Sequence, residues 1–259
     1  MPGPQTLIAA NWKMHGSVAF ADELCGKLAE LPVPRQVTVV VLPPSVYLGR
    51  VADALRATRL QWGAQNAHGE AEGAFTGEVA AEMIRDLGGS WLLVGHSERR
   101  AYFGETDELL AAKYVAALRA GLTPIFCVGE TLAEREADRA TSVVSAQLRA
   151  LAERAGPAAV SRGVVAYEPV WAIGTGETAT PEQAQEMHQL IRGELRQLDP
   201  ELGTQVPILY GGSMNADNAA GLLAQPDIDG GLVGGASLQA ASFAAIIEAA
   251  ARQAGVTGT

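Results

Sequence analysis

Eight short apolar runs recur along the 259-residue chain, separated by stretches with helical spacing. The runs are rich in β-branched residues and apolar on both faces, as in "VTVVVL" and "GVVAY", which is typical of parallel strands covered on both sides. We expect strands at residues 6–14, 37–44, 60–66, 91–97, 123–130, 163–169, 206–213 and 229–236. Among the intervening stretches we expect helices at 19–31, 107–120, 132–155, 181–198 and 238–254. Pro181 directly follows Thr180, which predicts a helix capped by Thr180 with proline in its first turn.

This alternation predicts a parallel sheet with helices outside it. The length alone allows two small domains or one large barrel. Eight units in about 250 residues match a closed (β/α)₈ barrel, and no Pro/Gly-rich linker interrupts the pattern. We therefore predict an α/β protein whose residues 1–259 form one barrel domain. The alternative is a doubly wound open sheet, but Asn11-Trp12-Lys13 stands where a glycine-rich dinucleotide fingerprint would follow the first strand.

The composition limits the classes of partner. A hydrophobic content of 48% supports a substantial core, and a charged fraction of 19% argues against disorder. The net charge of −10 disfavours binding to nucleic acid or to an anionic membrane surface, so an anionic substrate must be held by a local site. The two cysteines, Cys25 and Cys127, suggest no disulfide framework, and we expect reduced thiols and a cytoplasmic location. The start shows no secretory signal pattern, and no segment approaches the ~20 apolar residues of a membrane span.

In a barrel of this kind the carboxyl ends of the strands line the active site. The candidate residues at those ends are Asn11 and Lys13 after the first strand, His96, Ser97 and Glu98 after the fourth, Glu168 after the sixth, Gly211, Gly212 and Ser213 after the seventh, and Gly234 and Gly235 after the eighth. Each could be structural when taken alone. Together they place a cation, an imidazole, a carboxylate and two glycine-rich turns at one mouth.

Two features of this set point to a phosphorylated substrate. The chain has only three lysines, and one of them, Lys13, falls at the barrel mouth. The glycine-rich turns present backbone N–H groups just ahead of predicted helices, where barrels of this kind hold phosphate. The four histidines (His15, His68, His96 and His188) are scattered without the spacing of metal ligands, so we expect no metal centre.

Six motifs, in order, resemble those of the triosephosphate isomerase family over essentially the full length of the chain. They are "AANWKM", "QNAHGEAEGAFTGE", "VGHSERRAYFGETD", "YEPVWAIGTGETAT", "YGGSMNADN" and "GLVGGASL". The resemblance implies an enzyme that interconverts dihydroxyacetone phosphate and D-glyceraldehyde 3-phosphate through an enediolate, as a step of glycolysis and gluconeogenesis. It implies no cofactor.

The same resemblance assigns roles to individual residues. It implies that Glu168 is the base, His96 a neutral electrophile, Lys13 a positive charge near the oxyanion and the phosphate, Asn11 a donor that orients Lys13 and the substrate, and Glu98 a partner of Lys13. It implies that backbone N–H groups of Gly174, Ser213, Gly234 and Gly235 bind the phosphate. Residues 169–179, hereafter the lid, are expected to close over the intermediate. The family often has lysine in place of Glu177, which leaves the motion of the lid open.

The resemblance also implies a homodimer formed through the loop of residues 65–78. The tip of this loop carries Phe75 and Thr76, and Thr76 is expected to support Asn11 and Lys13 of a second subunit. His68 lies in a part of the loop that varies among relatives, which leaves the details of the interface open.

Rival functions on the same barrel make different demands. A Schiff-base aldolase needs an interior lysine, commonly on the sixth strand, and "GVVAYEP" has none. A metal-dependent epimerase or aldolase needs clustered histidine and carboxylate ligands. Another phosphate-binding barrel isomerase or epimerase is an alternative, as is a barrel kept only as a scaffold. The scaffold predicts loss of a reacting residue, whereas Lys13, His96 and Glu168 are all present.

Overall fold

The computed structural model describes residues 6–173 and 178–255. In these ranges eight parallel strands form a closed barrel in which each strand pairs with the next and β8 pairs with β1. The strands are β1 (Thr6–Asn11), β2 (Val37–Leu42), β3 (Gln61–Ala64), β4 (Trp91–Val94), β5 (Thr123–Val128), β6 (Val164–Tyr167), β7 (Ile208–Tyr210) and β8 (Gly230–Val233). The predicted α/β barrel is confirmed.

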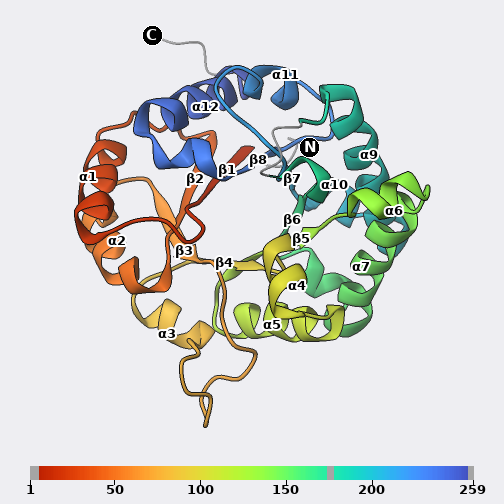
Figure 1. Cartoon of the computed structure of the whole chain (residues 1–259), viewed down its shortest axis with the longest axis horizontal. Helices are drawn as coiled ribbons and strands as arrows, with labels where there is room; N and C mark the ends of the chain where they lie inside the picture. Colours follow the sequence, from red (N-terminus) through yellow and green to blue (C-terminus); the bar gives the residue numbers. More distant parts are fainter. Residues whose placement is uncertain (1–5, 174–177, 256–259) are drawn as a thin grey trace.

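Helices surround the strands as an outer ring (Figure 1). They are α1 (Val18–Ala29), α2 (Leu48–Leu55), α3 (Ala81–Asp86), α4 (Ser97–Phe103), α5 (Asp107–Arg119), α6 (Leu132–Glu136), α7 (Ala140–Ala155), α8 (Pro157–Val160), α9 (Pro181–Leu198), α10 (Leu202–Gln205), α11 (Ala219–Leu223) and α12 (Ala240–Gln253). Within the described ranges, none of them has the length and apolar character needed to span a membrane.

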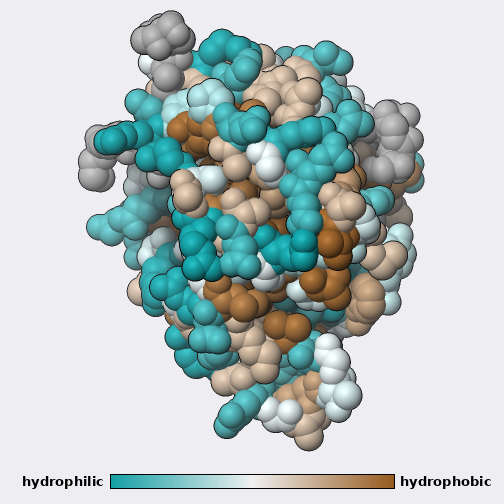
Figure 2. Space-filling model, turned by 90° about the vertical axis from the view of Figure 1, so that its left-hand side faces the viewer, coloured by the Kyte–Doolittle hydropathy of each residue, from teal (hydrophilic) through white to brown (hydrophobic). Residues whose placement is uncertain are grey.

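The longer ring helices bury one face. In α1 the buried residues Ala21, Leu24, Cys25 and Leu28 recur at spacings of three and four. The outer face on this side of the ring carries hydrophilic residues with smaller hydrophobic patches between them (Figure 2).

Two expected elements are longer than the ones in the structure, and in each case a residue with positive φ explains the difference. Strand β1 ends at Asn11 instead of residue 14, because Lys13 adopts a left-handed φ of 51° that no strand accommodates. The helix expected at 132–155 is two helices, α6 and α7, because Asp138 between them has a φ of 55°. Aspartate tolerates this conformation better than most residues. The helix is therefore interrupted without the glycine or proline that would indicate a break in the sequence.

The predicted start of α9 is confirmed. The Thr180 side chain accepts the Gln183 N–H, the Gln183 side chain accepts the Thr180 N–H, and Pro181 fills the first helical position. This reciprocal cap fixes the helix that directly follows the lid.

The apolar interior has two layers. The larger one lies between the strands and the ring of helices. The smaller one contains only strand residues, including Leu7 and Ala9 of β1 and Val164 and Ala166 of β6, and therefore fills the inside of the barrel. Because successive strand side chains point to opposite faces, alternate residues of every strand except β3 enter this inner layer.

Candidate functional site

The carboxyl ends of the strands surround a pocket of about 390 Å³. Nine of its lining residues are strand-end candidates from the sequence: Asn11, Lys13, His96, Glu168, Gly211, Gly212, Ser213, Gly234 and Gly235. His15, Ile173, Met214, Asn215, Leu232 and Ala236 complete the lining. The structure therefore brings together side chains that lie more than 200 residues apart in sequence.

Two of these side chains reach the pocket because they continue rows of the inner core. Asn11 follows Leu7 and Ala9 at the next inward position of β1, and Glu168 follows Val164 and Ala166 on β6. Both are polar groups at the top of an apolar column, 4% and 1% exposed respectively. Buried polar groups need partners, so their contacts show how the pocket is organised.

His96 reaches the pocket through a turn. Gly95 adopts a left-handed φ of 77° after β4, so the strand expected at 91–97 ends at Val94, and α4 begins at Ser97. His96 caps this helix, since its Nδ1 accepts the Glu98 N–H at 3.2 Å. An Nδ1 that accepts a hydrogen bond leaves the proton of a neutral imidazole on Nε2, which faces the pocket side of the ring.

Glu168 binds both groups at the start of α4. Its Oε2 accepts the Ser97 N–H at 2.8 Å, and its Oε1 lies 3.0 Å from His96 Nε2. Burial raises the pKa of Glu168, but His96, the Ser97 N–H and Lys13 together lower it below its ordinary value. The carboxylate is therefore ionised at neutral pH.

The same contact acts on His96 in the opposite sense. Burial and Lys13 lower the pKa of His96, and the carboxylates of Glu168 and Glu98 raise it, with a net increase while Glu168 is in contact. Once Glu168 moves away, its contribution is lost. Burial, Lys13 and the Glu98 N–H on Nδ1 then favour the neutral imidazole, and among the residues described the Glu98 carboxylate alone opposes them.

Lys13 is held in a restrained position. Its N–H donates to Asn11 Oδ1 at 3.0 Å, its Nζ donates to Glu98 Oε1 at 2.6 Å, and its side chain is 24% exposed. A Cβ added at Gly234 would lie 3.5 Å from Lys13 Cε, so the lysine stem passes beside the eighth-strand turn. One cation thus lies next to both the carboxylate side and the glycine side of the pocket.

Close approach explains the glycine at the end of β7. A Cβ at Gly211 would lie 2.9 Å from Glu168 Cγ, and the Gly211 N–H donates to the Tyr167 carbonyl at 2.7 Å. A larger residue at this position would push Glu168 out of place. After β8, the Gly234 carbonyl accepts both the N–H and the hydroxyl of Ser237, at 2.9 and 2.7 Å, which fixes the turn.

Two predicted site residues are not part of this assembly. Thr76 is exposed in the loop of residues 65–78, which projects beyond the ring near α3 (Figure 1). Gly174 lies outside the described residues. Conversely, Gln65 was missed as a contributor, although its Nε2 donates to the carbonyls of Lys13 and Leu42 at 2.9 and 2.8 Å. It follows β3, so the strand-end rule applied to that strand would have found it.

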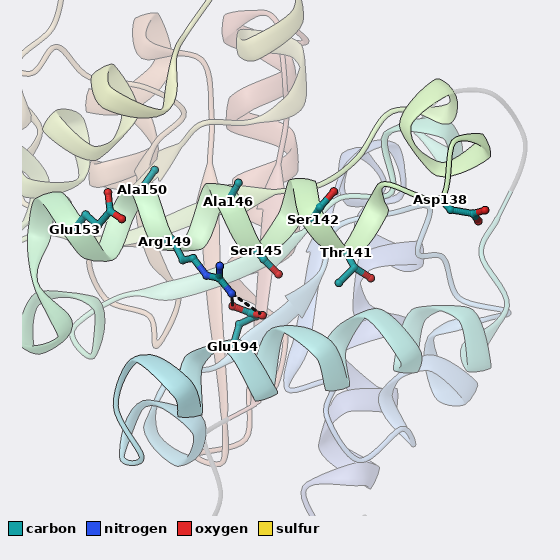
Figure 3. Close-up of a pocket in the computed structure, with 9 residues that line it drawn as sticks. All are labelled: Asp138, Thr141, Ser142, Ser145, Ala146, Arg149, Ala150, Glu153 and Glu194. Atoms are coloured by element: carbon teal, nitrogen blue, oxygen red, sulfur yellow. Dashed lines mark hydrogen bonds and ion pairs between the residues drawn. The ribbon is translucent and has the colours of Figure 1, made fainter.

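A second hollow lies outside the barrel, between α7 and α9 (Figure 3). Its centre is the ion pair of Arg149 with Glu194, at 3.1 Å, flanked by hydroxyl side chains of α7. It contains none of the strand-end residues. In the part of the chain that the structure describes, no three histidine, cysteine or carboxylate side chains are grouped to hold a metal ion.

Comparison with known proteins gives this pocket a family context. The model of the triosephosphate isomerase family matches residues 6–250. The chain belongs to the triosephosphate isomerase family. The triosephosphate isomerase of Thiobacillus denitrificans is 56% identical over 246 residues, covering 95% of this chain and 98% of the relative. Those of Stenotrophomonas maltophilia and Xanthomonas oryzae pv. oryzae are 53% and 52% identical, with the same coverage. The range matched by the family contains every residue that lines the pocket.

Proposed function

We propose that this chain is a triose-phosphate isomerase, which interconverts dihydroxyacetone phosphate and D-glyceraldehyde 3-phosphate by proton transfer through an enediolate. The observation that carries the proposal is the arrangement of Glu168 and His96: an ionised carboxylate and an imidazole meet in one pocket, beside a lysine and two glycine turns. Membership of the triosephosphate isomerase family supports the same reaction.

Glu168 is the base in this proposal. The reaction removes a proton from the carbon next to a carbonyl and returns it to the neighbouring carbon, and one carboxylate above both carbons can do both. A carboxylate inside a closed, dry pocket is a stronger base than one in water. Its position at the top of an apolar strand row supports this role.

His96 is the electrophile. Negative charge develops on the substrate oxygen, and a preorganised donor at that point lowers the barrier. The Nε2–H of a neutral imidazole provides such a donor, and the acceptance of the Glu98 N–H by Nδ1 selects this tautomer. The start of α4 next to His96 also disfavours an imidazolium, because the helix N-terminus carries partial positive charge. A neutral histidine in this role is characteristic of the triosephosphate isomerase family.

Lys13 supplies positive charge to the oxyanion and to the phosphate. Asn11 orients it through the 3.0 Å bond to its backbone, and Glu98 holds its ammonium group at 2.6 Å. Against an overall charge of −10, this local cation is what draws a dianionic substrate to the pocket.

The phosphate is bound by backbone N–H groups of Ser213, Gly234 and Gly235, with help from the Ser213 hydroxyl and from Gly174. Glycine turns let the phosphate approach the backbone closely. The lid then excludes water. An exposed enediolate next to a phosphate eliminates it, so closure protects the intermediate as well as drying the pocket.

We further propose a homodimer formed through the loop of residues 65–78. Phe75 at its tip is 44% exposed, and its ring lies against the His68 ring with the two centroids 4.0 Å apart. Another hollow adjoins the pocket at Lys13 and is bordered by Met14, Tyr102 and Phe103, which are 95%, 79% and 67% exposed. The loop tip of a second copy, with Thr76, would cover these apolar side chains and support Lys13.

Two further inferences concern the whole chain. Closure of the sheet by pairing of β8 with β1 supports one domain over residues 1–259. Cys25 and Cys127 are both buried free thiols, which fits a reducing compartment, and we propose the cytoplasm.

The test of the proposed function is a coupled assay of glyceraldehyde 3-phosphate isomerisation with and without a chelator. We expect full activity in both. Loss of activity with chelator would support a metal-dependent enzyme, and conversion to any product other than dihydroxyacetone phosphate would refute the proposal.

A further inference from the structure

Gln147 is a buried polar side chain in the apolar face of α7. That face buries Val144, Leu148 and Leu151, and Gln147 lies between them at 8% exposure. A primary amide at such a place has to find partners inside the protein. Both of its groups bind one residue: Oε1 accepts the Gly129 N–H at 2.9 Å, and Nε2 donates to the Gly129 carbonyl at 3.1 Å.

Gly129 lies just beyond the end of β5, where the strand ladder no longer serves it. The last paired residues of β5 and β6 are Val128 and Tyr167. Beyond them the Glu168 N–H still donates to the Val128 carbonyl at 2.8 Å, so Glu168 remains attached to this strand end. Gln147 therefore provides the hydrogen-bond partners of Gly129 that a neighbouring strand would otherwise provide.

The backbones of Gly129 and Glu168 are in tight contact. A Cβ added at Gly129 would lie 1.8 Å from the Glu168 carbonyl oxygen and 3.3 Å from its Cα. Any shift of Gly129 toward β6 therefore displaces the backbone of Glu168. Packed interiors pass such shifts on, because they have no free space to absorb them.

The next residue connects the same strand end to the start of the lid. Glu130 is fully buried, its carbonyl accepts the Val170 N–H at 3.1 Å, and its Oε1 accepts Trp171 Nε1–H at 2.9 Å and the Tyr167 hydroxyl at 3.0 Å. The positions on both sides of Glu168 are thus anchored to Glu130, the residue next to Gly129.

From these contacts we propose that Gln147 is a positioning residue for Glu168: acting through Gly129, it fixes the strand-end backbone from which the base projects. The inference rests on the proposed function, because it takes Glu168 as the base. Gln147 does not line the pocket, and both of its hydrogen bonds within the described residues are to Gly129, so its effect on the reaction passes through that residue.

The chain offers a matched control. Gln185 of α9 makes the same kind of two-bond contact, donating to Asp227 Oδ2 at 2.6 Å and accepting the Asp227 N–H at 3.1 Å. Asp227 precedes β8 and lies at the amino end of the barrel, opposite the pocket. Gln185→Leu removes as many hydrogen bonds as Gln147→Leu, but far from the base.

The experiment compares the two leucine variants by thermal unfolding and by steady-state kinetics of the isomerisation. Both should lose stability. Gln147→Leu should lower kcat by about 10-fold or more, because misplacing a catalytic group by about 1 Å can cost ~10²-fold. Its KM should stay within about twofold of the wild-type value, since the phosphate turns follow β7 and β8. Gln185→Leu should keep the wild-type kcat. An unchanged kcat in Gln147→Leu, or the same loss in both variants, overturns the proposal.

A milder variant decides the matter if Gln147→Leu does not fold. Gln147→Asn keeps both groups of the amide but carries them on a stem one methylene shorter, which withdraws them from Gly129 without adding a charge. We expect a kcat below that of the wild type with KM unchanged, and a wild-type kcat overturns the proposal. A wild-type enzyme without isomerase activity would instead refute the proposed function, so the two failures are distinguishable.

Discussion

Glu168 and His96 are in direct contact across the mouth of the barrel, with Oε1 3.0 Å from Nε2, while Oε2 accepts the Ser97 N–H. No substrate carbon fits between two groups at this distance. A substrate carbonyl can therefore reach His96 only after the carboxylate has moved aside. The contacts that hold Glu168 here also lower its pKa, so the proposed base is ionised in this arrangement.

Shortening the base tests its placement. Glu168→Asp withdraws the carboxylate by one methylene, on the order of 1 Å, and we expect kcat to fall by about 10²-fold with the fold intact. Steady-state kinetics and circular dichroism measure the two effects. Glu182→Asp, at an exposed position on α9, is the control and should change neither. A Glu168→Asp enzyme with nearly wild-type kcat would exclude Glu168 as the base.

Removing the cation tests whether it serves both phosphate and oxyanion. Lys13→Met should raise KM for the triose phosphate and lower kcat, because both binding and the transition state lose a positive charge. Lys27→Met is the matched control, since Lys27 is exposed and pairs only with the neighbouring Glu23 among the contacts described. A change in KM alone would leave Lys13 with the phosphate only, and a change in kcat alone would leave it with the oxyanion.

Removing part of the lid tests its protective role. Deleting residues 173–176 should leave Glu168 able to abstract the proton while the enediolate stands open to water. Inorganic phosphate would then be eliminated, with methylglyoxal as a major product of each turnover. The measurement is the ratio of methylglyoxal to isomerised product. A loss of stability with the wild-type product ratio would show that the segment has only a structural role.

The proposed dimer is tested at the loop tip. Phe75→Glu places a charge on the side chain that is expected to enter the second subunit, and should shift the protein toward monomers with a lower kcat. Analytical ultracentrifugation across micromolar concentrations measures the shift. Leu132→Glu, at an apolar position that is 52% exposed on α6, should leave association unchanged. A wild-type protein that is already monomeric would contradict the proposal.

Acid stability should depend on His188. This side chain is fully buried beside the rings of Tyr167 and Tyr210, and its Nδ1 lies 3.2 Å from the Asp227 carbonyl, to which it donates. Burial lowers the pKa of His188 to about 3. The unfolded chain takes up a proton below about pH 6.5 and the folded chain does not until about pH 3, so the folded state loses stability as the pH falls between these values.

The size of this effect can be measured by urea unfolding between pH 6.5 and 4. A single proton gives at most ~1.4 kcal/mol of unfolding free energy per pH unit. His188→Gln keeps a donor for the Asp227 carbonyl and lacks the titrating group, so its dependence on pH should be weaker by about one proton. Equal slopes in the two proteins would assign the acid sensitivity to other groups.

The barrel and most of the pocket could be predicted from sequence because both follow from one regularity. Alternating strands and helices determine the fold, and the carboxyl ends of the strands determine where polar residues converge. Asn11 and Glu168 are found in this way, each two residues beyond an inward-facing alanine. Knowledge of the family added the roles of these residues, which spacing alone does not contain.

The contacts that support the pocket residues from the surrounding helices could not be predicted. Gln147 is 18 residues from Gly129 in sequence, and its place in the apolar face of α7 indicates burial but not which group its amide binds. The break at Asp138 was missed for a similar reason, since an aspartate with positive φ looks in sequence like any helical aspartate. Such features depend on how two elements pack, and periodicity describes only one element at a time.

Lys13 stands where the backbone would suit glycine, with a φ of 51° that most side chains avoid. Glycine at this position would suit the backbone better, but it would remove the cation that the proposed reaction uses. The stability of the fold and the rate of the proposed reaction therefore make opposite demands on this residue. Lys13 marks where stabilising changes to this enzyme should not be sought, however favourable they look from the backbone alone.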